Sequence, residues 1–181
     1  MSKPVSALNG ATFQGFASIR EIGPLGMITL RAKGVKALEK AVKSVTGCKL
    51  PAQRKIELNG DKACGWMSPD EYLLIVPYAE VGAALASLAS DLAGEHHLAV
   101  DVSDARAVFR IEGDKAADVL RKLSPVDFDK LEPGELRRSR AAQVAAAMWQ
   151  QDGGYTLVCF RSVAGYVMGL LSHSAQVGSE L

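Results

Sequence analysis

Residues 65–74 read GWMSPDEYLL, and residues 148–157 read MWQQDGGYTL. Each stretch has a tryptophan, a short polar segment and then a tyrosine that opens an apolar run. Polar residues that include Pro, Asp or Gly between two apolar runs are typical of a hairpin turn. We therefore predict a β-hairpin in each stretch, and the two hairpins indicate an internal repeat.

A regular series of elements surrounds the first hairpin. Residues 26–31 alternate as a half-buried strand does, and residues 34–46 carry apolar side chains at spacings of three and four, which predicts an amphipathic helix that Gly47 ends. After the hairpin, a second apolar stripe predicts a helix over residues 81–92, and alternation predicts a strand over residues 98–102.

The elements around the second hairpin follow the same order. Residues 107–111 alternate as a strand, and a helix opens at Gly113. The hairpin strands follow at residues 142–149 and 155–160, and Ser162 is placed to cap a last helix. The repeated series is β-α-β-β-α, closed in the first half by a sixth element.

This order predicts an α+β protein with two tandem ferredoxin-like β-α-β-β-α(-β) halves. We expect an irregular N-terminal arm over residues 1–24, because that segment is only weakly periodic and ends at a Gly-Pro break. The first half then spans residues 25–103 and the second spans residues 104–181, and the two form one compact domain overall.

The composition is that of an ordinary globular protein, with 48% hydrophobic and 23% charged residues. Its net charge of +1, from 21 basic and 20 acidic side chains, gives no long-range attraction for nucleic acid or an anionic membrane. The N-terminal residues lack the apolar run of a secretory signal, and residues 163–171 are too short to span a bilayer. We expect a cytoplasmic protein with neither nucleic acid nor membrane as a partner.

The sequence shows few groups suited to catalysis. Cys48, Cys64 and Cys159 are far apart and form no CxxC pair, and adjacent residues such as His96 and His97 point to opposite faces of a strand. Glycine-rich phosphate-binding motifs are absent from the sequence. We therefore predict no catalytic residue, no metal site and no cofactor bound by this chain.

A basic cluster, Arg137, Arg138 and Arg140, lies in a segment of charged residues and proline that we expect to be a loop from residue 124 to about 140. Such a cluster is either a solvated loop or a contact with an acidic partner surface. Both interpretations are open at this point.

Four segments together carry a resemblance to a known family. They are VDVSDAR at residues 100–106, IEGDKA at 111–116, WMSPDEYLL at 66–74 and RSVAGYVMGLL at 161–171. Each segment is weak alone, but the ordered set resembles the γ subunit family of heterotetrameric sarcosine oxidase, from about residue 26 to residue 172. That family is in turn similar in fold to the folate-binding aminomethyltransferase (T-protein) of glycine cleavage.

The resemblance implies a complex in which α, β and δ subunits are the partners of this chain. Such a complex oxidises sarcosine to glycine and hydrogen peroxide and passes the one-carbon unit to tetrahydrofolate. The resemblance places the FAD, FMN, NAD and folate sites in the other subunits, and it makes this chain a companion that packs against them.

Candidate site residues follow from the matched segments. Arg106, Arg161 and Tyr166 are candidate partner contacts, because they lie in those segments. Asp61 is the nearest positional match to the carboxylate that engages folate in T-protein-like enzymes, although the surrounding residues 59–62 depart from the folate motif. Two further hypotheses are a stand-alone folate-binding or aminomethyltransferase-like protein and a regulatory dimer with the same fold.

Overall fold

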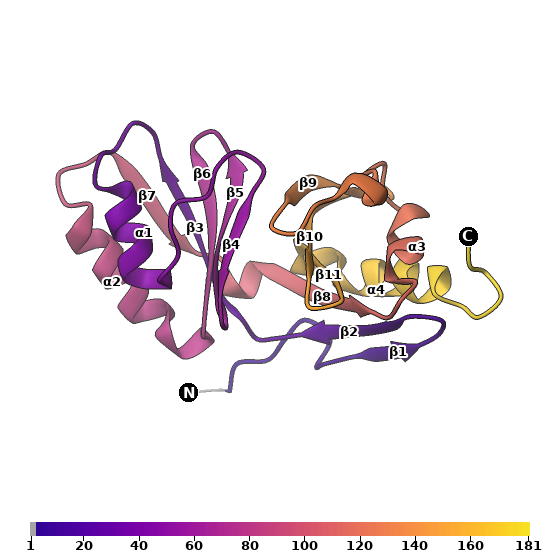
Figure 1. The fold of residues 1–181 in the computed structure, drawn as a ribbon. Helices are drawn as coiled ribbons and strands as arrows, with labels where there is room; N and C mark the ends of the chain where they lie inside the picture. The colour runs from indigo at the N-terminus through magenta and orange to yellow at the C-terminus, as the bar shows by residue number, and fades with distance from the viewer. Residues whose placement is uncertain (1–2) are drawn as a thin grey trace. The chain divides into compact units, whose positions relative to one another are not determined.

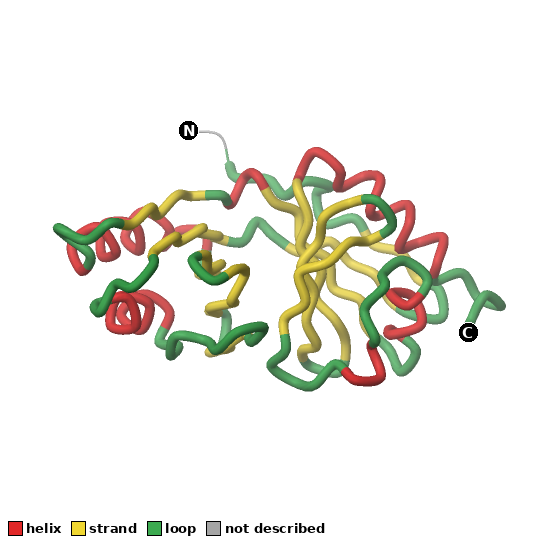
Figure 2. Tube along the Cα trace, turned by 90° about the horizontal axis from the view of Figure 1, so that it is seen from above, coloured by secondary structure: helices red, strands yellow, loops and turns green. Residues whose placement is uncertain are grey.

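The computed structural model describes residues 3–181, and the chain divides into two compact units (Figure 1). One unit is Leu25–Ser103, and the other combines the segment that ends at Pro24 with Asp104–Leu181. Each unit has one antiparallel sheet with helices beside it, and Figure 2 shows these helices in red and the strands in yellow. The prediction of an α+β protein is confirmed.

The unit Leu25–Ser103 contains five strands and two α-helices within its contiguous chain. In order, these are β3 (Gly26–Ala32), α1 (Leu38–Thr46), β4 (Ile56–Asn59), β5 (Lys62–Ser68), β6 (Glu71–Val76), α2 (Val81–Asp91) and β7 (His97–Asp101). The sheet order is β4-β5-β6-β3-β7, and every neighbouring pair is antiparallel. Without the edge strand β4, this is the ferredoxin-like arrangement, as predicted.

Helices α1 and α2 cover one face of this sheet and complete its core. Buried side chains from both helices, among them Val42 and Leu88, meet Leu30 and Leu74 from the central strands. Helix α1 ends where the sequence predicts, because Gly47 adopts a left-handed conformation with φ of 71° that side chains with a Cβ disfavour.

The second unit is built from both ends of the chain. Its elements are β1 (Thr12–Gln14), β2 (Ser18–Ile22), β8 (Arg106–Glu112), α3 (Ala116–Arg121), β9 (Leu136–Ala141), β10 (Val144–Gln151), β11 (Gly154–Phe160) and α4 (Ala164–Ser174). The sheet order is β1-β2-β8-β11-β10-β9, with antiparallel pairs throughout. Core side chains of α3 and α4 pack on one face of this sheet.

The N-terminal segment corrects the prediction of an irregular arm. Residues 1–2 lie outside the described part of the chain, but strand β2 pairs with β8 and so holds the position that β7 holds in the other unit. The second ferredoxin-like half is therefore completed by a strand from the start of the chain. The sequence of β2 lacks the usual alternation of apolar and polar residues, because one of its two core-facing positions is Ile19 and the other is the acidic residue Glu21.

Two further expectations for the second half are wrong. The segment from residue 124 to about 140, which we expected to be a loop, contains strand β9. Its arginines resemble the charged residues of a solvated loop, and this is why the sequence does not indicate a strand there. Ser162 does not cap α4, because the helix begins after Val163 and has no side-chain cap. The hairpin between β10 and β11 is confirmed, and its turn lies at Asp152 and Gly153.

None of the helices within residues 3–181 is long and apolar enough to cross a membrane.

Glu21 fixes the N-terminal loop that precedes β1. Its side chain accepts hydrogen bonds from the Ser6 hydroxyl at 2.7 Å and from the backbone N–H groups of Leu8 at 3.1 Å and Gly10 at 2.8 Å. Glu21 is only 2% exposed, so water does not readily replace these bonds. The Glu21 carboxylate, which interrupts the apolar pattern of β2, therefore holds the N-terminal loop against the sheet.

We predict that Glu21→Ala lowers the free energy of unfolding by about 2 kcal/mol, because three donors lose their acceptor. Urea denaturation monitored by circular dichroism measures the change. The control is Gln14→Ala on β1, which removes one exposed side-chain hydrogen bond to Ser18. Equal stability of the two variants would contradict the role given to Glu21.

Candidate functional site

The sequence-predicted contact residues Arg106, Arg161 and Tyr166 all belong to the second unit, whereas Asp61 belongs to the first. Arg106 begins β8, Arg161 follows the last residue of β11, and Tyr166 lies in the first turn of α4. The structure therefore brings the first two to the same end of one sheet, since β8 and β11 are antiparallel neighbours.

Arg106 stacks on an aromatic ring at this sheet end. Its guanidinium carbon lies 4.3 Å from the ring centroid of Phe160, the residue directly opposite on β11. The Phe160 side chain is exposed, at 49%, although it is large and apolar. A cation over an aromatic face is attracted by the ring quadrupole, so the pair forms an ordered surface feature.

Arg161 has an intramolecular role. Its guanidinium donates hydrogen bonds of 3.2 Å to the carbonyl oxygens of Val5 and Ser6. It therefore holds the N-terminal segment against the end of β11. A contact between Arg161 and a partner stays a prediction.

Tyr166 lies on the outer side of α4, where it is 51% exposed. Gly165 and Gly169 are also exposed, and a Cβ added at either glycine would meet no heavy atom within 4 Å. This side of the helix is open to solvent around the Tyr166 ring.

Asp61 lies in the turn between β4 and β5, beside Gly60. Its side chain is exposed, so the carboxylate faces solvent in this structure. A role for Asp61 toward folate stays a prediction.

All three cysteines are buried free thiols. Burial raises the pKa of Cys64 well above its ordinary value, and burial raises the pKa of Cys159 to about 11. Because the thiolate is the nucleophilic form, these two groups are held in the unreactive form at neutral pH. Within residues 3–181, no cluster of three or more His, Cys, Asp or Glu side chains is arranged to hold a metal.

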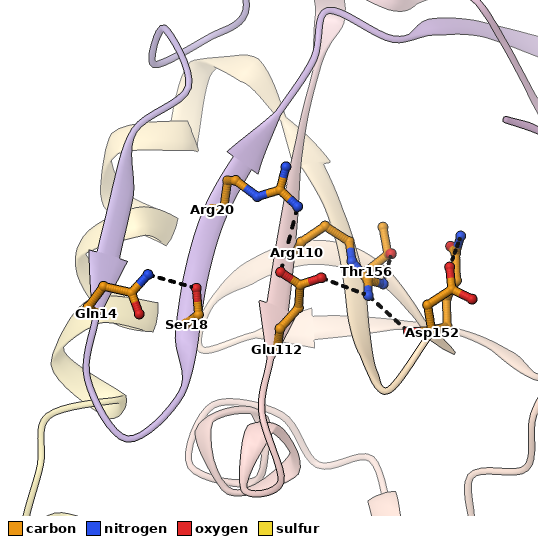
Figure 3. Close-up of polar contacts among 8 residues, drawn as sticks. Gln14, Ser18, Arg20, Arg110, Glu112, Asp152 and Thr156 are labelled. Atoms are coloured by element: carbon orange, nitrogen blue, oxygen red, sulfur yellow. Dashed lines mark hydrogen bonds and ion pairs between the residues drawn. The ribbon is translucent and has the colours of Figure 1, made fainter.

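A polar network around Arg110 lies on the face of the second unit's sheet opposite its helices (Figure 3). The Arg110 guanidinium donates to the Thr156 hydroxyl at 2.9 Å and to the carbonyl oxygen of Gln151 at 3.0 Å. It also lies 3.4 Å from a Glu112 carboxylate oxygen, whose partner oxygen is 3.6 Å from Arg20. Arg110 is 7% exposed, so a charged group is buried with its hydrogen bonds satisfied.

Arg110 was not singled out in the sequence, but a signal was available. It is the one charge within the apolar run of residues 107–111. In a strand covered by helices on one face, such a charge indicates a position on the other face. Its partners Thr156 and Gln151 lie near it because β11 pairs with both β8 and β10, and the sequence alone does not reveal these pairings.

Comparisons with known proteins agree on one family. The family model for "Sarcosine oxidase, gamma subunit family" matches residues 32–176. The chain belongs to the sarcosine oxidase gamma subunit family. A curated relative, sarcosine oxidase subunit gamma from Corynebacterium sp. (strain U-96), is 34% identical over 141 residues, which are 74% of this chain. The match spans 66%, just under two thirds, of that relative's own length.

Solved structures show the same fold. A chain of the heterotetrameric sarcosine oxidase from Corynebacterium sp. U-96, in complex with pyrrole 2-carboxylate, superposes with a TM-score of 0.80 at 25% identity, covering 91% of this chain and 87% of that one. The glycine cleavage system aminomethyltransferase T from Bartonella henselae superposes with a TM-score of 0.67 at 12% identity, covering 91% of this chain and 47% of that one. This chain therefore has the T-protein-like fold that the family resemblance implies.

We predict that Arg110→Met lowers the free energy of unfolding by about 2 kcal/mol, because it leaves the buried Thr156 hydroxyl and Gln151 carbonyl without their donor. Thermal and urea denaturation measure the effect. The matched control is Arg20→Met, which removes an exposed 3.6 Å ion pair to the same Glu112 and costs less than about 0.5 kcal/mol. A smaller loss for Arg110→Met than for the control would contradict the analysis.

We also predict that the thiols resist alkylation in the folded protein. With a pKa of about 11, roughly a thousandth of Cys159 is thiolate at pH 8, and burial limits access further. We expect the folded chain to be unmodified after treatment with iodoacetamide at pH 8, as measured by intact mass. The same treatment in 8 M urea, which unfolds the chain, alkylates all three cysteines. Rapid single labelling of the folded chain at Cys64 or Cys159 would show that a reactive thiol exists.

Proposed function

We propose that this chain is the γ subunit of a heterotetrameric sarcosine oxidase, where it assembles with α, β and δ subunits. The complex oxidises sarcosine to glycine and transfers the one-carbon unit to tetrahydrofolate. The observation that carries the proposal is the family match over residues 32–176, together with superposition over 91% of the chain on a chain of such an assembly.

In this proposal the chain contributes a folded docking surface, and the other subunits hold FAD, FMN, NAD and tetrahydrofolate. The state of the thiols supports this division, because burial keeps Cys64 and Cys159 protonated at neutral pH. Free, unpaired cysteines are also typical of a reducing compartment, which supports assembly in the cytoplasm.

The contact residues in this proposal are Arg106 and Tyr166, with Phe160 beside Arg106. Arginine, tyrosine and phenylalanine are enriched at protein interfaces, and all three side chains reach the surface of the second unit. Arg161 contributes by fixing the N-terminal segment next to this surface through Val5 and Ser6.

A stand-alone folate-binding protein is the second candidate, and the fold shared with aminomethyltransferase T favours it. That function needs a carboxylate directed into a cavity. Asp61 is exposed in a hairpin turn, so it meets this requirement only after a rearrangement of that turn. We therefore rank the subunit function first.

We predict that the chain co-elutes with the large subunits when all four subunits from the same organism are expressed together and separated by gel filtration. The reason is that a companion subunit is retained through its interface. Expression of the α, β and δ subunits without this chain is the control, and it gives a smaller particle.

Elution of this chain apart from the other three subunits would contradict the proposal. Calorimetric titration of the isolated chain with tetrahydrofolate then separates the candidates. Binding at micromolar concentration that Asp61→Asn weakens would favour the folate-binding protein.

A further inference from the structure

Strand β7 ends the five-stranded sheet of the first unit, where β3 is the strand beside it (Figure 1). The N–H of Val102 donates to the carbonyl oxygen of Met27 at 2.8 Å, which fixes the phase of the hydrogen bonds between the two strands. Because the backbone groups of an antiparallel strand point alternately to its two sides, Val100 bonds to β3 and Ala99 does not. The N–H and C=O of Ala99 therefore point outward along the open edge of the sheet.

Strand β7 also exposes two large apolar side chains on one face. Leu98 is 53% exposed and Val100 is 41% exposed. Both point away from α1 and α2, because Ala99 between them packs against the core on the helix side. An edge strand that presents outward backbone groups beside apolar side chains is a template for pairing with another strand.

The other sheet edges within residues 3–181 carry features that discourage pairing. Strand β1 has three residues and β4 has four, so each offers only a short ladder. Strand β9 has three arginines among its six residues, and charged side chains on an edge oppose the addition of a strand. Strand β7 has five residues, and its carboxylate, Asp101, lies at the end. This edge is therefore the best suited to accept a further strand.

The sequence of β7, HLAVD, is complementary to itself when two copies run antiparallel. With Ala99 opposite Ala99 of a second copy, Leu98 lies opposite Val100 and His97 lies opposite Asp101. Four apolar side chains then meet on one face, and on the other face each imidazole lies across from a carboxylate. The Ala99 pair is hydrogen-bonded in this register, because its N–H and C=O already point outward.

Helix α2, which packs over β3 and β7, suits the same arrangement. The Asp91 carboxylate accepts a hydrogen bond of 2.7 Å from Ser44 on α1, which marks the side of α2 that faces α1. Helical geometry puts Gly82, Ala86 and Ala89 on the other side, toward the sheet edge, and all three are exposed. Since strands lie about 4.8 Å apart, pairing through β7 places two copies of α2 roughly 10 Å apart, a usual distance for packed helices. Side chains no larger than a methyl group allow this approach.

We infer that two copies of this chain associate through β7, with antiparallel pairing centred on Ala99. The pairing continues the sheet of one copy into the other, so neither β7 edge stays open. A second copy is favoured over a strand from a different protein, because the side chains of β7 match their own reversed order in charge and polarity. The inference goes beyond the proposed function, since it concerns a second copy of this chain and uses residues other than Arg106, Phe160 and Tyr166.

Sedimentation velocity of the isolated full chain at increasing concentration measures the association. We expect a reversible monomer–dimer equilibrium in the micromolar range, because the interface is small. Ala99→Pro raises the Kd about 10-fold or more, since it blocks the central hydrogen bonds between copies and removes no bond to β3. Val100→Lys also raises the Kd about 10-fold or more, because it puts a charge among the four apolar side chains.

The matched control is Val177→Lys, which makes the same change at a side chain that is 78% exposed and lies outside β7. It leaves the Kd within about twofold, as expected for a surface substitution away from the contact. Circular dichroism and the Tm confirm that each variant is folded.

Disulfide formation tests the register of the pairing. A mixture of Leu98→Cys and Val100→Cys chains forms a cross-linked dimer on mild oxidation, because the two Cα atoms of this opposite pair are about 4.5 Å apart. Neither variant cross-links alone, since identical positions lie diagonally across the pair, with Cα atoms about 7–8 Å apart. The natural cysteines, Cys48, Cys64 and Cys159, are buried and do not compete.

Three outcomes contradict the inference. If the wild type stays monomeric at every concentration, β7 does not pair with a second copy, while the proposed function stands because co-elution with the α, β and δ subunits tests it separately. If a dimer forms and both Ala99→Pro and Val100→Lys leave its Kd unchanged, another surface holds the dimer. If the wild type is monomeric and Ala99→Pro abolishes co-elution with the other subunits, the strand that pairs with β7 belongs to one of those subunits.

Discussion

The pairing of β2 with β8 is the constraint on which the second unit depends. Strands β8 and β11 at the centre of that sheet need a neighbour on the β8 side, and the chain supplies it from residues 18–22. Ile19, fully buried, enters the core that α3 and α4 complete. The first unit occupies residues 25–103 between the two segments of the second, so a deletion near the N-terminus acts on a sheet formed mainly by the C-terminal half.

The sequence predicted those parts of the fold in which local patterns and tertiary packing agree. The hairpins, α1 with its terminating Gly47 and the order of the first unit were all predicted, because alternation and helical spacing there are undisturbed by charge. Strands β2 and β9 were missed for a common reason. Glu21 occupies a core-facing position in β2, and three of the six residues of β9 are arginines. The Glu21 carboxylate accepts hydrogen bonds from Ser6, Leu8 and Gly10, donors that only the folded chain brings close.

The candidate site shows the same limit. The family resemblance identified Arg106, Arg161 and Tyr166 as candidate contacts. The sequence could not show which of these side chains makes hydrogen bonds to other parts of the same chain. Arg161 is bound to the carbonyl groups of Val5 and Ser6, which are more than 150 residues away in sequence. Arg106 and Phe160 become neighbours through strand register alone. Arg110 shows why an isolated charge in an apolar strand is informative: its burial is stabilised by Thr156 and Gln151.

The discontinuous second unit also has a consequence for biosynthesis. On the ribosome, residues 25–103 emerge as an uninterrupted segment and contain every strand of their own sheet, so this unit can fold while translation continues. Strand β2 emerges earlier but has no β8 to pair with until residues 106–112 leave the exit tunnel, and β11 and α4 follow later still. The nascent chain can form the β1–β2 hairpin early, but β2 lacks its β8 neighbour until residues 106–112 have emerged, so the second sheet is completed only late in synthesis.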